Sequence, residues 1–326
     1  MNKNLIKETK LEYRDKINIP NIPFGIEIEF AQANFNTVRK NLEKTLNYNP
    51  VKIKWDEKKY EITDQYKLWR LKNEITVQTY SSDESHEKFG GEVISPIMKN
   101  QKKYWKELKQ ICETLKKTEN IELNGNCSIH IHTDKKIYNQ IQEYKNLLKL
   151  IMLYQDIVIK FFLGETDRIR EMMPRCAKPM STYIYTNLDK LEQIETEEEL
   201  NKFLHYDRKW LFNFMNLGPK KKQTLENRGG NPTLNENTIQ NYVLFNHNFL
   251  NYAKKENFDD EFIEYKIKKY QTLSLADALK TKTRKAQELT NLIIKDELDK
   301  LYILKQYLKL YNENDIEKKY HLWYYH

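Results

Sequence analysis

The sequence is poor in cysteine and lacks any long hydrophobic run. Its three cysteines, Cys112, Cys127 and Cys176, are far apart and odd in number, so they match neither a zinc-binding pattern nor a disulfide framework. No apolar run approaches the roughly 20 residues of a membrane-spanning helix. The first residues, Met-Asn-Lys-Asn-Leu-Ile-Lys-Glu, lack the apolar core of a secretory signal. We therefore expect a protein of the reducing cytoplasm that does not enter a membrane.

The composition predicts a folded protein with an excess of positive charge. The 326 residues include 22 Tyr and 13 Phe, 39% are hydrophobic and 31% are charged, which excludes a disordered chain and suits one large domain or two ordinary ones. The formal net charge of +8 would suit an acidic partner, such as nucleic acid or a nucleotide phosphate. However, the lysines are interleaved with glutamates, and no stripe of aromatic and basic residues is present. Nucleic-acid binding, whose affinity would fall steeply with salt, therefore ranks last among the possible functions.

Residues 23–30, Pro-Phe-Gly-Ile-Glu-Ile-Glu-Phe, show the two-residue period of a β-strand. Side chains at positions i and i+2 share one face of a strand, so Glu27 and Glu29 point the same way, about 7 Å apart. Two neighbouring carboxylates repel each other and lose hydration when buried, unless a cation lies between them. The alternative for this pair alone is a half-exposed edge strand with two solvated glutamates.

Later segments carry further ligand-type residues, and two of them repeat the spacing of i and i+2. Residues 89–98, Phe-Gly-Gly-Glu-Val-Ile-Ser-Pro-Ile-Met, predict a second apolar strand that carries Glu92. Residues 125–134 end in Ser-Ile-His-Ile-His-Thr-Asp, and the alternation places His130 and His132 on one strand face. A His-x-His pair is also typical of a zinc site or a structural pair. No third histidine lies near it, and the one nearby cysteine has no partner, which weakens the zinc interpretation.

Residues 224–233, Thr-Leu-Glu-Asn-Arg-Gly-Gly-Asn-Pro-Thr, place Glu226 and Arg228 two positions apart. A guanidinium beside an acidic metal ligand can hold a phosphate with two parallel hydrogen bonds. Standing alone, the pair would be interpreted as a surface ion pair. Taken together, the oxygen ligands and one imidazole of these segments suit Mg²⁺ or Mn²⁺ better than zinc. Metal-bound phosphates and phosphoryl transfer explain all of the segments at once.

Strand patterns dominate the first half of the chain and helix patterns the second, which predicts an α+β fold with an antiparallel sheet. Residues 164–206 are polar, and we expect a loop-rich excursion able to act as a lid. Residues 1–22 are expected to form an amino-terminal arm, residues 23–255 the catalytic domain, and residues 256–326 a helical extension. Further strands are predicted at 51–55, 66–72 and 74–78, and helices at 34–46, 104–115, 137–162, 236–252 and 262–312.

The segments Gly-Ile-Glu-Ile-Glu, Gly-Gly-Glu-Val-Ile-Ser-Pro, Ser-Ile-His-Ile-His-Thr-Asp and Thr-Leu-Glu-Asn-Arg-Gly-Gly-Asn follow one another in an order and at a spacing that resembles the putative amidoligase family. The resemblance covers roughly residues 22–250, and the ordered set is more specific than any one segment. This family belongs to the carboxylate–amine ligases. The resemblance implies an antiparallel sheet of the glutamine synthetase catalytic type, with helices packed on one side.

The resemblance also implies roles for the strand residues. Glu27 and Glu29 resemble paired glutamates that each serve a different divalent ion and belong to the catalytic machinery. Glu92 matches an acidic metal ligand, and His130 matches a metal ligand near the nucleotide phosphates. His132 would contact substrate or orient the strand.

In the last segment, Glu226 matches a further metal ligand, and Arg228 matches a catalytic residue that stabilises the transferred phosphoryl group. Arg168 and Arg170 are the expected nucleotide- or substrate-binding residues of the excursion. The chain departs from the family pattern at residues 72–76, Lys-Asn-Glu-Ile-Thr, where Asn73 or Glu74 would have to replace an acidic residue.

The function implied is an ATP- and Mg²⁺- (or Mn²⁺-) dependent ligase that joins a carboxylate to an amine through an acyl phosphate. Its substrate would be an amino acid, a peptide or a protein. Two alternatives share the fold: a non-catalytic nucleotide- or peptide-binding module, and a phosphotransferase resembling guanidino kinases. The module would bind ATP without turnover, whereas the kinase would release a phosphorylated product.

Overall fold

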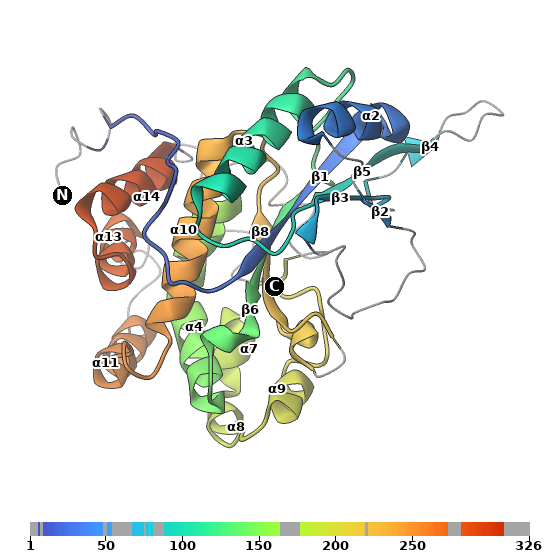
Figure 1. The fold of residues 1–326 in the computed structure, drawn as a ribbon. Helices are drawn as coiled ribbons and strands as arrows, with labels where there is room; N and C mark the ends of the chain where they lie inside the picture. Colours follow the sequence, from blue (N-terminus) through green and yellow to red (C-terminus); the bar gives the residue numbers. More distant parts are fainter. Residues whose placement is uncertain are drawn as a thin grey trace.

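The protein is described here by a computed structural model. It describes residues 6, 9–47, 51–53, 67–74, 76–77, 79–80, 88–163, 177–218, 221–272 and 282–309. These residues form an α+β fold built on an eight-stranded sheet (Figure 1). The strand order is β2-β3-β5-β1-β6-β8-β7, with β4 paired to β5, and every pair is antiparallel except β2–β3. The predicted α+β class is confirmed.

The strands are β1 (Phe24–Asn34), β2 (Val51–Ile53), β3 (Arg70–Lys72), β4 (Thr79–Tyr80), β5 (Lys88–Ile94), β6 (Ile129–Asp134), β7 (Phe212–Asn213) and β8 (Thr224–Gly230). The α-helices are α2 (Phe35–Leu46), α3 (Lys102–Lys117), α4 (Ile141–Leu163), α7 (Ser181–Thr186), α8 (Leu188–Glu192), α9 (Glu197–Phe203), α10 (Glu236–Tyr252), α11 (Asp260–Gln271), α13 (Lys282–Ile293) and α14 (Glu297–Lys309). Two 3₁₀ turns, η2 (Lys135–Ile137) and η3 (Met215–Leu217), flank β6 and β8.

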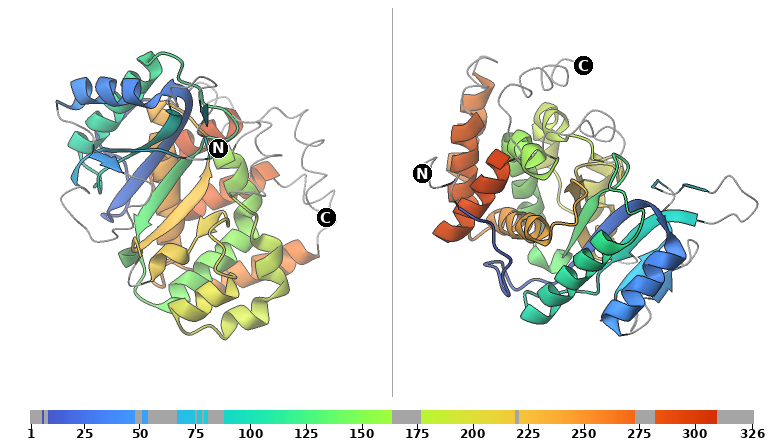
Figure 2. Two further views of the ribbon diagram at one scale, coloured as in Figure 1. Left: turned by 90° about the vertical axis from the view of Figure 1, so that its right-hand side faces the viewer. Right: turned by 90° about the horizontal axis from the view of Figure 1, so that it is seen from above.

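The two faces of β1 differ because its residues alternate. The apolar side chains of Phe24, Ile26, Ile28 and Phe30 are buried on one face. The ring of Phe24 lies 5.5 Å from that of Trp105 on α3 and 5.0 Å from that of His247 on α10 (centroid distances). Helix α2 packs against α3 and β1, so α2, α3 and α10 cover this face (Figure 2). The other face of β1 carries its glutamates.

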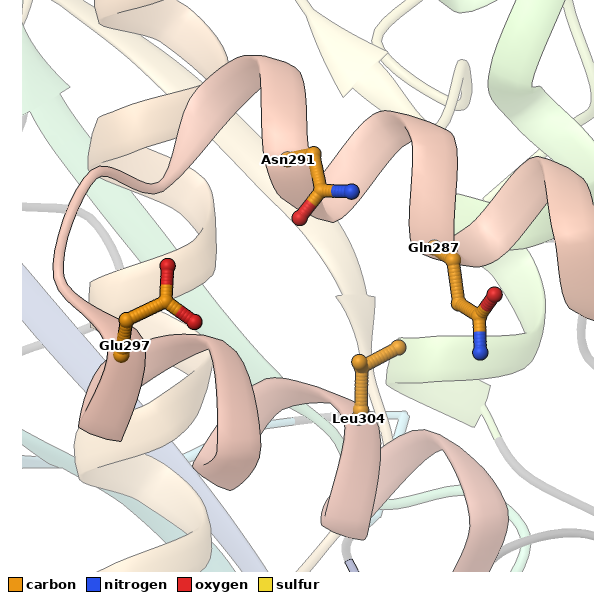
Figure 3. A pocket seen from close by; sticks show the side chains of 4 residues that line it. All are labelled: Gln287, Asn291, Glu297 and Leu304. Atoms are coloured by element: carbon orange, nitrogen blue, oxygen red, sulfur yellow. The ribbon is translucent and has the colours of Figure 1, made fainter. Parts of the chain in front are cut away.

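The carboxyl-terminal helices belong to the same hydrophobic core as the sheet. Helices α11 and α13 pack against α4, and α13 and α14 pack against α10. The buried Asp299 of α14 receives hydrogen bonds from Arg14 and, at 2.8 Å, from Asn18, so the amino-terminal segment is tied to α14 (Figure 1). A small pocket between α13 and α14 is lined by two amides, one carboxylate and a leucine (Figure 3). None of its lining residues belongs to the sheet.

The prediction of a loop-rich excursion at residues 164–206 is wrong for the described part, residues 177–206, because helices α7, α8 and α9 lie there. The acidic run at 195–199 begins α9: Thr196 and Glu199 form a capping box, and Glu197–Glu199 lie in the first turn. Negative charge there is favourable because it complements the helix dipole. Short helices of this kind depend on burying residues such as Ile184 and Leu200, which no local pattern shows.

Two further differences from the predicted elements concern the strands. The strand predicted at 74–78 is wrong, because Thr76 and Val77 form a turn and β4 begins only at Thr79. Strand β1 runs beyond its predicted end to Asn34, with a register irregularity after Phe30. Among the described residues, no helix combines the length and apolar character needed to cross a membrane.

Candidate functional site

Cross-strand pairing gathers the predicted site residues on the face of the sheet opposite α2, α3 and α10. Glu27 on β1 is the direct partner of His130 on β6, and His132 is the partner of Glu226 on β8. Glu29 is the partner of Glu92 on β5. Directly opposed residues share one face of a sheet, so these side chains from four adjacent strands form one cluster. All six are buried, with exposures of 7% or less.

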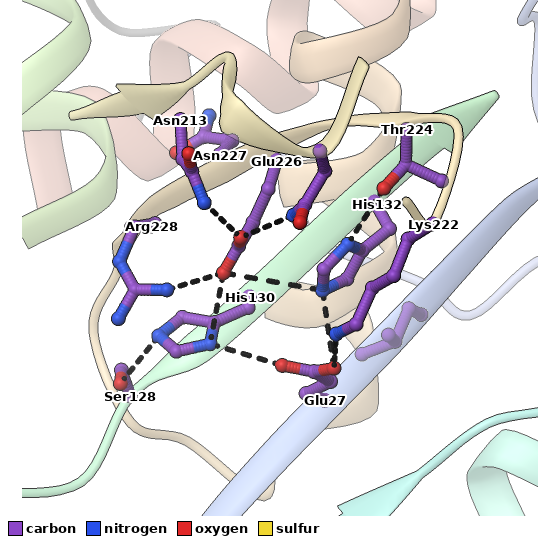
Figure 4. A network of polar contacts seen from close by, with 12 residues as sticks. Glu27, Ser128, His130, His132, Asn213, Lys222, Thr224, Glu226, Asn227 and Arg228 are labelled. Carbon is purple, nitrogen blue, oxygen red and sulfur yellow. Dashed lines mark hydrogen bonds and ion pairs between the residues drawn. The ribbon is translucent and has the colours of Figure 1, made fainter. Parts of the chain in front are cut away.

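Glu27, His132 and Glu226 are arranged as a metal site would require. One ligand atom from each lies within 4.8 Å of the other two. His132 Nε2 is 3.1 Å from Glu27 Oε1 and 4.0 Å from Glu226 Oε1 (Figure 4). Two carboxylates and an imidazole from three different strands can enclose a divalent cation without any change in the backbone.

His132 points one ring nitrogen at the two carboxylates. Its Nδ1 lies 3.1 Å from Thr224 Oγ1, whereas its buried Nε2 lies 3.1 Å from Glu27 Oε1 without the geometry of a hydrogen bond to any described residue. If Nδ1 donates its proton to the threonine, Nε2 presents a lone pair toward the two carboxylates, which is the tautomer of a metal-bound histidine. The residue with the least defined role in the sequence therefore lies at a ligand position.

His130 lies between the two carboxylates. Its Nδ1 is 3.1 Å from Glu27 Oε2 and 3.5 Å from Glu226 Oε1, and its Nε2 is 2.9 Å from Ser128 Oγ. Burial, and then the charge of Arg228, lower the pKa of His130, so the imidazole is neutral near pH 7. His130 is a second imidazole available to the same cation.

Glu226 is held by donors that fix its orientation. Asn213 and Asn216 donate to Oε2 at 2.7 and 3.0 Å, and Arg228 donates to Oε1. Burial alone would raise the pKa of Glu226, but Arg228 and the two histidines hold it at about 2. With Glu226 only 3% exposed, the interpretation as a surface ion pair with Arg228 is excluded. Neither asparagine belongs to a predicted motif, although Asn213 is a polar residue between Phe212 and Phe214.

Glu29 and Glu92 form a second carboxylate pair beside the first site. Burial, followed by the charge of Glu92, raises the pKa of Glu29 to about 8. Burial, followed by the charge of Glu27, raises that of Glu92 to about 7. Ser128 donates to Glu29 at 2.5 Å, and Lys72 of β3 donates to Glu92. The raised pKa values reflect burial first and neighbouring negative charge second, and a bound cation would offset both effects.

Two lysines also lie on this face, Lys72 and Lys222. Lys72 is the β3 partner of Glu92, and its Nζ also lies 3.2 Å from Glu74. Glu74 thereby joins the charged cluster, so it is better placed than Asn73 to supply the acidic residue of the family pattern. Lys222, just before β8, lies 3.1 Å from Glu27 Oε1. The local sequence does not mark either lysine as a site residue. Lys72 reaches the cluster through strand pairing, and Lys222 reaches it from the segment just before β8.

Arg168 and Arg170 lie outside the described residues. Their expected nucleotide- or substrate-binding role stays a prediction.

Metal-free protein should lose stability as the pH rises from about 6.5 to about 8. The raised pKa values mean that folded Glu29 and Glu92 keep protons that the unfolded chain has released, so their contribution to stability falls from about pH 4.5 and is lost by about pH 8. Glu27, Glu226 and His130 have lowered pKa values, and their contributions are already complete above about pH 6.5. We expect a loss of about 2 kcal/mol, measured by urea denaturation in chelator.

Glu29→Gln should remove most of this slope, whereas Glu261→Gln, an exposed residue of α11, should leave it unchanged. An equal slope in wild type and Glu29→Gln would contradict the assignment of the titration to this pair.

The protein therefore has an α+β fold with a candidate divalent-cation site. This site is the buried group of carboxylates and imidazoles on one face of the sheet. A family model described as a putative amidoligase enzyme matches residues 20–250, more than half of the chain. The chain belongs to this family, as the four sequence segments predicted. The family description denotes a ligase-type enzyme, which acts in general on a carboxylate and an amine. No curated protein and no solved structure matches the chain.

Proposed function

We propose that the protein is an ATP- and Mg²⁺-dependent carboxylate–amine ligase acting on an amino acid, a peptide or a protein. Family membership supports a ligase-type enzyme. The observation that carries the finer proposal is the convergence of Glu27, His132 and Glu226, with Arg228 bonded to the same carboxylate oxygen that faces the histidines. A cation site directly beside a guanidinium suits the phosphate groups of a nucleotide.

The donor set fits Mg²⁺ or Mn²⁺. Glu27, Glu226 and His132, with His130 beside them, would hold one ion, and Glu29 with Glu92 would hold a second. Carboxylate oxygens are the ligands that Mg²⁺ and Mn²⁺ prefer, and they make up the whole second site and half of the first. When bound, such ions neutralise phosphate oxygens and position them for transfer. The sheet, with helices on one face and carboxylates on the other, supports a fold of the glutamine synthetase catalytic type.

The proposed reaction has two steps. A substrate carboxylate oxygen attacks the γ-phosphorus of ATP, the bond to the ADP oxygen breaks, and an acyl phosphate forms. The amine then attacks the acyl carbon, the carbon–oxygen bond to phosphate breaks, and the amine gives up a proton. Arg228 stabilises the charge on the transferred phosphoryl group, and the buried face excludes the water that would hydrolyse the acyl phosphate. We also propose a cytoplasmic location, which the low cysteine content of the sequence supports.

Calorimetry with a non-hydrolysable ATP analogue tests this proposal. Wild type should bind the analogue only when Mg²⁺ is present, and Glu27→Gln should weaken binding at least about tenfold because it removes a charged ligand atom. Glu261→Gln is the matched control and should bind like wild type. Absence of binding at every metal concentration would reject the ligase function.

Product analysis then separates the enzymatic alternatives. Release of ADP together with free phosphate supports a ligase, whereas a stable phosphorylated product would identify a phosphotransferase. Nucleotide binding without turnover on any mixture of amino acids and peptides would indicate a non-catalytic binding module.

A further inference from the structure

The ammonium group of Lys222 binds the carboxylate oxygen that a divalent cation at the candidate site would need. Its Nζ lies 3.1 Å from Glu27 Oε1, the same atom that lies 3.1 Å from His132 Nε2 (Figure 4). A divalent cation held by Glu27, His132 and Glu226 would displace the ammonium of Lys222 from Glu27 Oε1. The ammonium and the divalent ion therefore compete for one carboxylate oxygen.

The turn before β8 allows the lysine side chain to withdraw without moving the strand. Gln223 fixes the backbone: its N–H donates to Asn216 O at 2.8 Å, and its side chain donates to Leu217 O at 3.2 Å. The side chain of Lys222 is 40% exposed, whereas that of Glu27 is 9% exposed. Because the neighbouring backbone is anchored and the lysine side chain is partly exposed, the flexible four-carbon side chain is the part that can move.

We propose that Lys222 is a metal-displaceable cation that moves from Glu27 to the terminal phosphate of the bound nucleotide. The inference rests on the proposed ATP-dependent function. Without the ion, the ammonium neutralises a buried carboxylate. Once a divalent ion takes the oxygen, the ammonium is repelled by it, and an anion bound to that ion would attract both charges. A lysine binds phosphate as a flexible point charge, which complements the fixed fork of Arg228 on the other side of Glu226.

The experiment uses the full chain carrying Lys222→Met, which keeps the apolar stem and removes the charge. Mn²⁺ binding without nucleotide, measured by electron paramagnetic resonance, should tighten about three- to tenfold because the competing ammonium is gone. Binding of the Mg²⁺ complex of a non-hydrolysable ATP analogue should weaken about tenfold, and binding of Mg·ADP should change little. Lys221→Met, the neighbouring lysine, is the matched control, and Lys222→Arg should behave more like wild type in both assays.

The opposite signs of the two effects separate this role from a structural one. A variant that loses affinity for both Mn²⁺ and the nucleotide, or changes neither, would overturn the proposal. An equal loss for ADP would overturn the assignment to the terminal phosphate. If wild type binds Mn²⁺ but no nucleotide, the proposed ATP-dependent function is rejected, and the proposed contact between Lys222 and the phosphate is rejected with it. The Mn²⁺ assay then still decides whether Lys222 competes with the metal.

Discussion

Arg228→Met should slow ATP consumption by about 10²-fold or more while leaving Mn²⁺ binding intact or tighter. Arg228 donates to Glu226, so its removal takes positive charge away from the reacting phosphate and adds net negative charge at the metal site. Loss of one preorganised donor to a developing charge costs on the order of 10²–10³-fold in rate. The rate is measured as ADP release with a mixture of amino acids and peptides as substrates, and metal affinity by titration with Mn²⁺.

Two variants accompany this measurement. Arg228→Lys keeps the charge but not the paired hydrogen bonds, so it should recover only part of the rate. Arg284→Met removes an exposed arginine of α13 and should retain full activity. Wild-type rates in Arg228→Met would contradict the phosphoryl-stabilising role. A parallel loss of Mn²⁺ binding would show that the residue mainly holds the site together.

Gly230→Ala should destabilise the protein by about 3 kcal/mol or prevent folding. Gly230 ends β8 opposite Ile129 of β6. A Cβ at this position would lie 2.4 Å from Ile129 O and 2.8 Å from Ile129 Cβ, and the first of these is backbone that cannot turn away. The two strands would have to separate where β6 begins, just before His130. Urea or thermal denaturation measures the loss.

The adjacent Gly229→Ala is the natural control. A Cβ there would lie 2.7 Å from Leu211 Cδ1, the end of a flexible side chain, and 3.3 Å from Asn227 Oδ1. Rotation of the leucine relieves this contact, so we expect a loss of about 1 kcal/mol. Equal losses in the two variants would contradict the idea that close approach of β8 to β6 explains the second glycine of the Gly-Gly pair.

Several elements were predictable because their signals are local. The two-residue alternation of β1 and β6 and the apolar spacing of α4 and α10 depend on neighbours a few positions away. Helix α10 occupies its predicted range, and α2 begins one residue after its predicted start because Asn34 caps it. Helices α7 and α8 were not predictable, since each is too short to form without the core that it covers. Helix α9 carries one local signal, the capping box of Thr196 and Glu199, which marks its start.

For the site, the alternation of residues in the sequence already shows which side chains share a strand face: Glu27 with Glu29, and His130 with His132. The four segments, in their order, also identify the family. Strand pairing in the folded sheet then places His132 opposite Glu226 and brings Lys72 and Lys222 to the carboxylates. The pleat of a strand fixes the side to which a residue points, and this is local. Strand order and register depend on the whole sheet, because they join residues that lie between 20 and 195 positions apart.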